Sequence, residues 1–234
     1  VAFIGGIIAV PVGGSFLFVI PAFLLLGLNG LETVLLGRIS TLSCMGSATG
    51  YFLLSQKYDW KVVIKFATFY LTGFIIAAKI ATSIDIDIFT KIVPWVLIIG
   101  AILLVKDYKV KSDKLQTIIV NLMPIIGLLL GLYAGLGGGG NGKIIVLLLT
   151  IVAGFTIHRS IVNTRMIELI GNVVAVASYL YFGAHLTGYE LPVIISGALG
   201  GFVGAKITLK SKPEWLKYAF MMLAFISAIK VTFF

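Results

Sequence analysis

Eight apolar runs joined by short loops make up nearly the whole chain, and they limit its fold more than any other feature of the sequence. About 20 consecutive apolar residues cross the hydrocarbon core of a bilayer as a helix. The backbone in lipid must satisfy its own hydrogen bonds, so segments of this length predict helices. We therefore expect an all-α, multi-pass membrane helix bundle. The runs span residues 1–28, 31–54, 62–82, 89–105, 117–153, 156–183, 189–209 and 216–234.

The composition excludes several classes of protein. The chain is 59% hydrophobic and only 12% charged, whereas soluble domains are about 45–50% apolar and about 25% charged. The net charge of +9 fits basic cytoplasmic loops better than nucleic-acid binding. The single Cys44 excludes an intramolecular disulfide and a multi-cysteine metal site. We find no paired carboxylates, histidine cluster, nucleophile–base arrangement or nucleotide motif, so we predict no enzyme, metal or cofactor.

Clusters of helix-breaking residues interrupt the first and fifth runs, at 11–15 and 135–142. Irregular backbone at membrane depth is tolerated where it is buried in protein or lines a polar cavity. A helix that restarts after each cluster would present its positive N-terminal end to an anion. Tight turns that serve packing alone are the alternative, and the two polar side chains could instead cap the helices. The candidate substrate-binding residues in these clusters are Gly13, Gly14, Ser15, Gly139, Gly140 and Asn141.

The two halves of the chain look like repeats. One offset of 127 residues places Arg38 on Arg165 and Gly73 on Gly200, and it also aligns the two breaker clusters. We predict a first membrane repeat at 1–105, a basic cytoplasmic linker at 106–116 and a second membrane repeat at 117–234.

The positions of the basic residues predict the topology. The loops at 55–60, 106–116, 154–159 and 210–215 carry or adjoin Lys and Arg. All four lie on one side if run 117–153 enters and returns as a hairpin, and the positive-inside rule then makes that side cytoplasmic. Each half would consist of a broken or re-entrant hairpin and three transmembrane helices. The halves would be inverted relative to each other, as in many transporters. Eight complete crossings with parallel repeats remain the alternative.

Two arginines lie inside apolar runs, where a charge needs a partner or a wet cavity. Helical spacing places Thr41 and Met45 on the face of Arg38, and Glu168 and Asn172 on the face of Arg165. Guanidinium groups form forked hydrogen bonds to oxyanions, so we predict that Arg38, Arg165 and Asn172 bind substrate. Two other interpretations remain open: the arginines snorkel to headgroups, or Arg165 simply pairs with Glu168. Glu168 is also a candidate proton carrier for coupled transport.

These motifs resemble those of the TauE/SafE family, the sulfite exporter-like membrane permeases. The likeness rests on the Gly-Gly-Ser-(x)5-Pro stretch from Gly13 to Pro21 and its repeat at 137–142. It also rests on Gly-Arg-Ile-Ser at 37–40, on Asn-Thr-Arg at 163–165, on the 51–60 segment and on the glycine-rich third span of each half. Arg38 departs from the Gly-Thr-Ser element that is usual in the first half. The resemblance covers the whole chain and implies transport of sulfite, sulfonates or related anions across the cytoplasmic membrane.

The sequence therefore predicts a secondary transporter of a small sulfur-containing anion, such as sulfite or an organosulfonate, working by alternating access. An anion channel and a permease for another small organic anion, such as a carboxylate, are the alternatives. The expected partners are the anionic substrate, the lipid bilayer and a coupling proton or ion, without nucleic acid. A homodimer is left open, as is the direction of transport.

Overall fold

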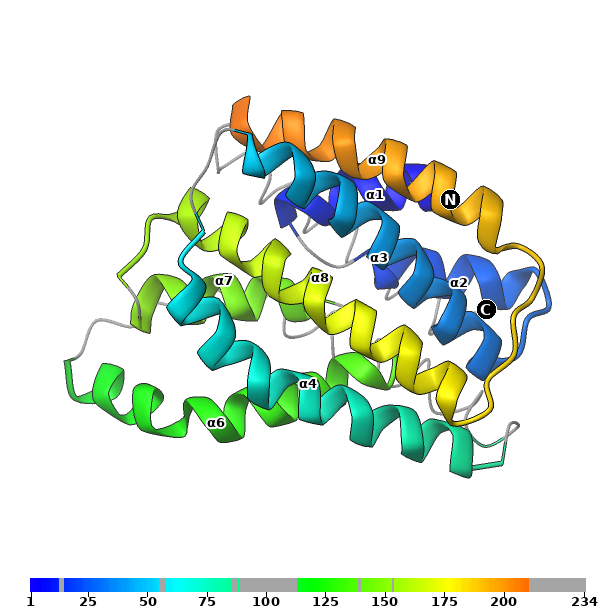
Figure 1. Cartoon of the computed structure of the whole chain (residues 1–234), viewed down its shortest axis with the longest axis horizontal. Helices are drawn as coiled ribbons and strands as arrows, with labels where there is room; N and C mark the ends of the chain where they lie inside the picture. Colours follow the sequence, from blue (N-terminus) through cyan, green and yellow to red (C-terminus); the bar gives the residue numbers. More distant parts are fainter. Residues whose placement is uncertain are drawn as a thin grey trace.

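The computed structural model describes residues 1–12, 15–54, 58–85, 88, 113–138, 140–152 and 154–210. Every regular element within these ranges is an α-helix (Figure 1). The expected runs at 89–105 and 216–234 lie outside the described residues, and so does most of the predicted linker, whose residues 113–116 begin a helix. The helices are α1 (Ala2–Val12), α2 (Phe16–Leu25), α3 (Gly30–Leu53), α4 (Trp60–Ser83), α6 (Asp113–Gly135), α7 (Asn141–Val152), α8 (Ile157–Tyr181) and α9 (Glu190–Lys210).

Both breaker clusters divide an apolar run into two helices, as the sequence predicts. Helix α1 ends at Val12 and α2 begins at Phe16, while α6 ends at Gly135 and α7 begins at Asn141. In the second break, Gly137 and Gly140 have φ angles of 98° and 84°. Residues with a Cβ rarely adopt this left-handed region, so glycine is required for the chain to turn here.

The long helices start at identifiable caps. The Asn29 side chain accepts a 2.9 Å hydrogen bond from the Glu32 amide, and Glu32 accepts one of 3.2 Å from the Asn29 amide. This reciprocal pair is a capping box, which satisfies two N–H groups at the start of α3. Helices α4 and α8 each start with a single capping bond, which the side chain of Asp59 or Thr156 accepts from a backbone amide of the first turn.

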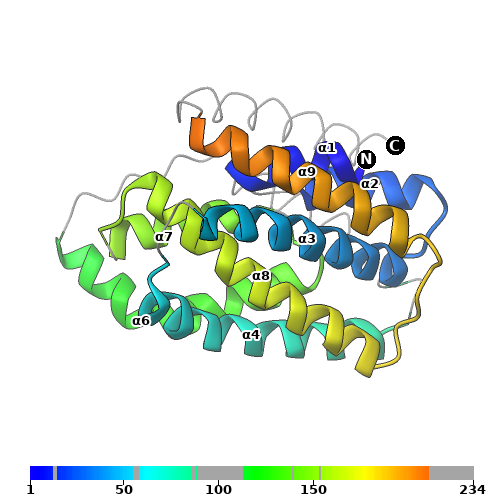
Figure 2. The ribbon, with the colours of Figure 1, turned by 45° about the horizontal axis from the view of Figure 1, so that its top comes forward.

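The packing of the two halves follows one pattern (Figures 1 and 2). Helices α3 and α8 pack against each other at the centre, α3 also packs against α9, and α8 also packs against α4. Helix α1 packs along α9, and α6 packs along α4. Exchanging α1, α3 and α4 for α6, α8 and α9 therefore reproduces these contacts, whereas the smaller contact of α1 with α3 has no counterpart of similar extent between α6 and α8. Figure 1 shows that α3 and α8 run in opposite directions, and so do α4 and α9.

Glycines allow the closest of these contacts. A Cβ on Gly200 of α9 would overlap the Phe3 carbonyl and lie in tight contact with the backbone of Gly6, both in α1. A Cβ on Gly73 of α4 would overlap the backbone of Leu128 and Gly131 in α6. Small residues let membrane helices approach closely, so the two glycines aligned by the 127-residue offset have equivalent packing roles.

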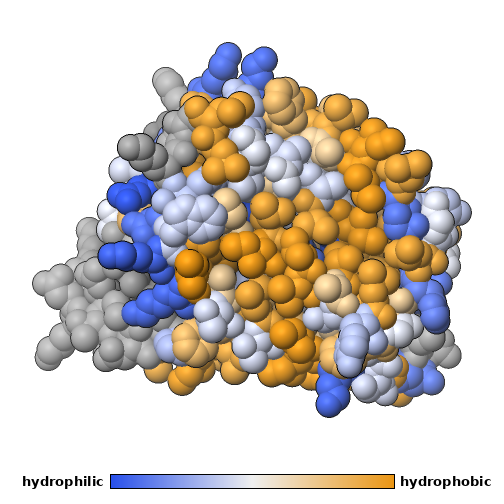
Figure 3. Space-filling view, viewed as in Figure 1, coloured by the Kyte–Doolittle hydropathy of each residue, from blue (hydrophilic) through white to orange (hydrophobic). Residues whose placement is uncertain are grey.

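The outer surface fits a lipid environment. Within the described residues, three helices are long and apolar enough to cross a membrane: Trp60–Ser83, His158–Tyr181 and Glu190–Lys210. Figure 3 shows a broad apolar surface over the middle of the molecule, with hydrophilic residues gathered at its two ends. A continuous exposed apolar surface is costly in water and favourable in hydrocarbon. The exposed apolar side chains of α4 and α9 include Ile64, Ile75, Leu191, Leu199 and Phe202.

Apart from the two helix breaks, the described connections fall into two groups at opposite ends of the bundle. At one end, on the left of Figure 1, lie the α3–α4 connection, the start of α6, the α7–α8 connection and the end of α9. The α2–α3 and α8–α9 connections lie at the other end. At the first end, a 3.2 Å ion pair joins Asp59, which precedes α4, to Arg159 in the first turn of α8. The basic residues of the sequence predict that the loops of the first group share one side of the membrane. The cytoplasmic location of that side stays a prediction.

Candidate anion-binding pocket

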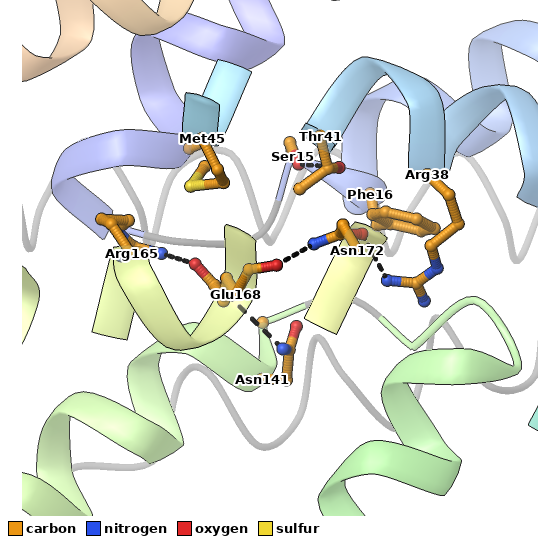
Figure 4. A pocket seen from close by; sticks show the side chains of 11 residues that line it. Ser15, Phe16, Arg38, Thr41, Met45, Asn141, Arg165, Glu168 and Asn172 are labelled. Carbon is orange, nitrogen blue, oxygen red and sulfur yellow. Dashed lines mark hydrogen bonds and ion pairs between the residues drawn. The ribbon is translucent and has the colours of Figure 1, made fainter. Parts of the chain in front are cut away.

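A pocket lies where the two helix breaks meet the middles of α3 and α8 (Figure 4). Both halves of the chain contribute to its walls. The space between them that protein atoms do not fill is about 300 Å³, its open part included. The lining residues are Ala9, Ser15, Phe16, Arg38, Thr41, Met45, Gly140, Asn141, Arg165, Glu168 and Asn172.

The pocket brings together most of the candidate residues predicted from the sequence. From the first half come Ser15 and Arg38, and from the second half Gly140, Asn141, Arg165, Glu168 and Asn172. The remaining candidates, Gly13, Gly14 and Gly139, lie outside the described residues. The substrate-binding role of all these residues stays a prediction.

Arg165 is completely buried and makes contacts on two sides. Its Nη1 atom forms an ion pair with Oε2 of Glu168. Its Nε atom donates a 2.9 Å hydrogen bond to the Val10 carbonyl, which lies in the last turn of α1, where carbonyls have no partner within the helix. The Nη2 atom is buried, and the part of the chain that the structure describes offers it no hydrogen-bond partner.

Arg38 is 2% exposed and has a different environment. Its Nη1 atom donates a 3.2 Å hydrogen bond to Oδ1 of Asn172, and Asn172 in turn donates one of 2.7 Å to the Glu168 carbonyl. The guanidinium carbon lies 4.1 Å from the centre of the Phe16 ring and 4.8 Å from that of Phe74. Such ring contacts attract a cation. No described residue accepts a hydrogen bond from Nε or Nη2 of Arg38.

The burial of both guanidinium groups excludes snorkelling to headgroups. The second alternative, pairing of Arg165 with Glu168, is present in the structure but accounts for one arginine only. Glu168 is the one carboxylate among the lining residues, which include the guanidinium groups of Arg38 and Arg165. Because arginine stays charged in proteins, the described lining holds two cationic groups and one carboxyl group.

The polar residues at the helix breaks turn inward. Ser15 does not cap α2, because its side chain makes no hydrogen bond to the first turn. Its hydroxyl instead lies 3.4 Å from that of Thr41. The Asn141 amide donates to the Tyr70 hydroxyl and lies 3.5 Å from Oε1 of Glu168.

Gly142 brings the start of α7 against the ion pair. A Cβ at this position would lie 2.6 Å from Oε1 of Glu168 and 2.8 Å from Nη1 of Arg165. Any side chain larger than hydrogen would displace one of these groups. The absence of a side chain therefore lets the positive end of the helix approach the Glu168 carboxylate.

Three aromatic residues of this region do not stand out in the sequence. Phe16 and Phe74 contact Arg38, and Tyr70 contacts Asn141. Phe16 directly follows a candidate residue, which is a weak signal. Tyr70 and Phe74 lie in α4, where aromatic residues are indistinguishable from ordinary packing residues. Helical spacing from Arg38 does find Thr41 and Met45.

Comparison with known families identifies the family of the chain. The family described as sulfite exporter TauE/SafE matches residues 1–231. The chain belongs to this family. The region matched to the TauE/SafE family includes both helix breaks and both arginines. The protein is therefore a membrane transport protein.

Two curated relatives of this TauE/SafE protein carry the same general description. The probable membrane transporter protein ORF9 of Sinorhizobium sp. is 28% identical over 236 residues, which cover 98% of this chain and 89% of the relative. A probable membrane transporter protein of Haemophilus influenzae is 23% identical over 235 residues, which cover 100% of this chain and 92% of the relative. No solved structure matches the chain. These names describe transporters rather than enzymes.

Proposed function

We propose that the protein is a secondary transporter of a small sulfur-containing anion, such as sulfite or an organosulfonate, in the cytoplasmic membrane. The observation that carries the proposal is the buried pocket with two guanidinium groups and one carboxylate in its described lining. An uncompensated buried charge is costly. A bound anion removes this cost, so the pocket favours an anion over a neutral or cationic ligand.

The unused hydrogen-bond donors support an oxyanion. Arg38 has two buried N–H-bearing atoms without a described partner, and Arg165 has one. Charge-assisted bonds from guanidinium to oxyanions are short and strong. A sulfite or sulfonate group offers three oxygens that point in different directions and can accept bonds from several donors. A carboxylate offers two oxygens in one plane, so carboxylate transport is the second candidate.

The packing pattern supports an inverted duplication and alternating access. The contacts of α1 with α9 repeat those of α6 with α4, and the central pair α3 and α8 is common to both halves. Corresponding helices run in opposite directions in Figure 1. Inverted repeats around a central site let one half rock against the other and expose the site to each side in turn.

Counterflow in proteoliposomes tests the function. Vesicles with purified protein are loaded with unlabelled sulfite, sulfate, thiosulfate, methanesulfonate or acetate, and uptake of a labelled member of the same panel is followed. Saturable uptake that trans-loaded sulfur oxyanions stimulate supports the proposal. Uptake without saturation or counterflow indicates a channel, stimulation by acetate alone indicates a carboxylate permease, and absence of protein-dependent uptake contradicts both transporter candidates.

A further inference from the structure

Glu168 is held in the pocket as a bound anion would be. Its Oε2 atom pairs with Arg165, and its Oε1 atom lies 3.5 Å from the Asn141 amide at the start of α7. Gly142 places the first turn of this 12-residue helix against the same carboxylate. Glu168 is 5% exposed and lines the pocket. The carboxylate therefore takes up part of the positive potential that would otherwise act on a ligand.

The pocket retains capacity beyond this internal carboxylate. The Nη2 atom of Arg165 and two atoms of Arg38 are buried without a partner among the described residues. With Glu168 ionised, one positive charge remains uncompensated, and one monovalent anion balances it. A divalent anion brings one negative charge too many, so it balances the pocket only when the single negative charge of the described lining, that of Glu168, is neutralised.

Glu168 is the group whose charge a proton can remove. Arg165 on α8 and Arg38 on α3 are permanently charged. Tyr70 on α4 and Cys44 on α3 also interact electrostatically with Glu168, and their side chains are ordinarily uncharged at neutral pH. The α7 residue that faces Glu168 is Asn141, whose side chain does not titrate. The charged residue of this turn of α7 is Lys143, two positions further along. The contact from α1 is the Val10 carbonyl, which binds Arg165.

We propose that Glu168 sets the charge that the pocket accepts: a monovalent anion binds alone, whereas a divalent anion binds together with one proton, taken up by Glu168. The proposal rests on the proposed function and specifies its substrate class. A proton from solvent adds to the Glu168 carboxylate as the dianion binds, and it leaves when the dianion is released. Each turnover then carries one net negative charge with either substrate.

Methanesulfonate and sulfate provide a matched pair of probes. Both are small tetrahedral sulfur oxyanions, neither changes its protonation near neutral pH, and they differ by one charge. Binding to the purified full chain is measured by calorimetry in buffers of different ionisation enthalpy, which reports the number of protons taken up. We expect about one proton with sulfate and none with methanesulfonate. By linkage, uptake of one proton makes the affinity for sulfate rise about tenfold per pH unit as the pH falls, while the affinity for methanesulfonate stays constant.

Variants separate Glu168 from other carboxylates. Glu168→Gln should bind sulfate without proton uptake and independently of pH. Glu32→Gln is the control, because Gln preserves the capping box of α3 outside the pocket, and it should behave as the wild type. Glu168→Asp keeps a carboxylate and should keep proton uptake.

Several results would overturn the inference. These are wild-type binding of sulfate without a proton, proton uptake with methanesulfonate, proton uptake that survives in Glu168→Gln, and failure of sulfate to bind at any pH between 5 and 8. If Glu168→Gln does not fold, the comparison of the two probes with the wild type decides the question alone. Absence of binding by every anion of the panel would instead contradict the proposed function itself.

Discussion

The Nη1 atom of Arg38 lies 3.2 Å from Oδ1 of Asn172, and this hydrogen bond joins α3 to α8 across 134 residues of sequence. The Asn172 side chain in the second half thus holds one edge of the Arg38 guanidinium group in the first half. Both residues line the pocket. The orientation of the arginine therefore depends on the contact between the two halves.

Asn172→Asp should weaken anion binding. The new carboxylate would face Arg38, remove the uncompensated positive charge and compete with the ligand. Loss of one charge-assisted interaction costs about 1.5–3 kcal/mol, so we expect a loss of affinity of at least about tenfold, measured by calorimetry with methanesulfonate. Asn29→Asp is the control, because Asp also caps a helix. Wild-type affinity in Asn172→Asp would contradict the assignment.

Removal of Arg165 alone should destabilise the protein, because it leaves Glu168 buried without its ion-pair partner. Breaking a buried pair costs about 3–5 kcal/mol, whereas replacing both members with uncharged groups is often nearly neutral. Arg165→Met should therefore unfold at much lower denaturant concentration than the wild type. The double variant Arg165→Met/Glu168→Gln should recover stability but not anion uptake. A double variant that transports at the wild-type rate would show that Arg165 has only a structural role.

Gly200→Ala should lower stability by disturbing the contact of α9 with α1. The new Cβ would overlap the Phe3 carbonyl, and overpacking typically costs about 1–3 kcal/mol. Gly50 in α3 has open space around it, so Gly50→Ala should leave stability unchanged or raise it by about 0.5–1 kcal/mol. Thermal unfolding in detergent compares the two variants. Equal effects would mean that helix propensity, rather than close packing, controls both positions.

The cytoplasmic assignment of the basic loops can be tested by labelling. In a Cys44→Ser background, single cysteines replace the exposed residues Leu54 and His158 at one end of the bundle, and Leu26 and His185 at the other. A membrane-impermeant maleimide added to intact cells should label the second pair only. Labelling of Leu54→Cys but not His158→Cys, or the reverse, would separate two loops that the fold places at one end.

Much of the arrangement could be predicted from the sequence because it depends on local chemistry. Clustered glycines disfavour a continuous helix, so both breaks fall within the predicted clusters, although Pro11 lies in the last turn of α1 and Pro124 lies inside α6. The shared offset of Arg38 and Arg165 indicates equivalent positions in two halves, and helical spacing extends each position to Thr41 or Asn172.

The remaining features depend on neighbours that the sequence does not reveal. Ser15 turns toward Thr41 instead of capping α2, because the hydroxyl of another helix lies within reach. Phe74 and Tyr70 reach the pocket region only through the packing of α4 on α8. The different surroundings of the two arginines arise from contacts between elements far apart in the chain.

Saturable anion uptake by the Arg38→Gln variant tests the central claim most directly, because Arg38 supplies the positive charge that no described carboxylate balances. Uptake of labelled sulfite or methanesulfonate into proteoliposomes is compared for the wild type, Arg38→Gln and Arg159→Gln, a control in which an exposed ion pair with Asp59 is lost. We predict saturable uptake by the wild type and the control, and a loss of affinity of more than about tenfold in Arg38→Gln. Uptake by Arg38→Gln with wild-type rate and affinity would contradict the account.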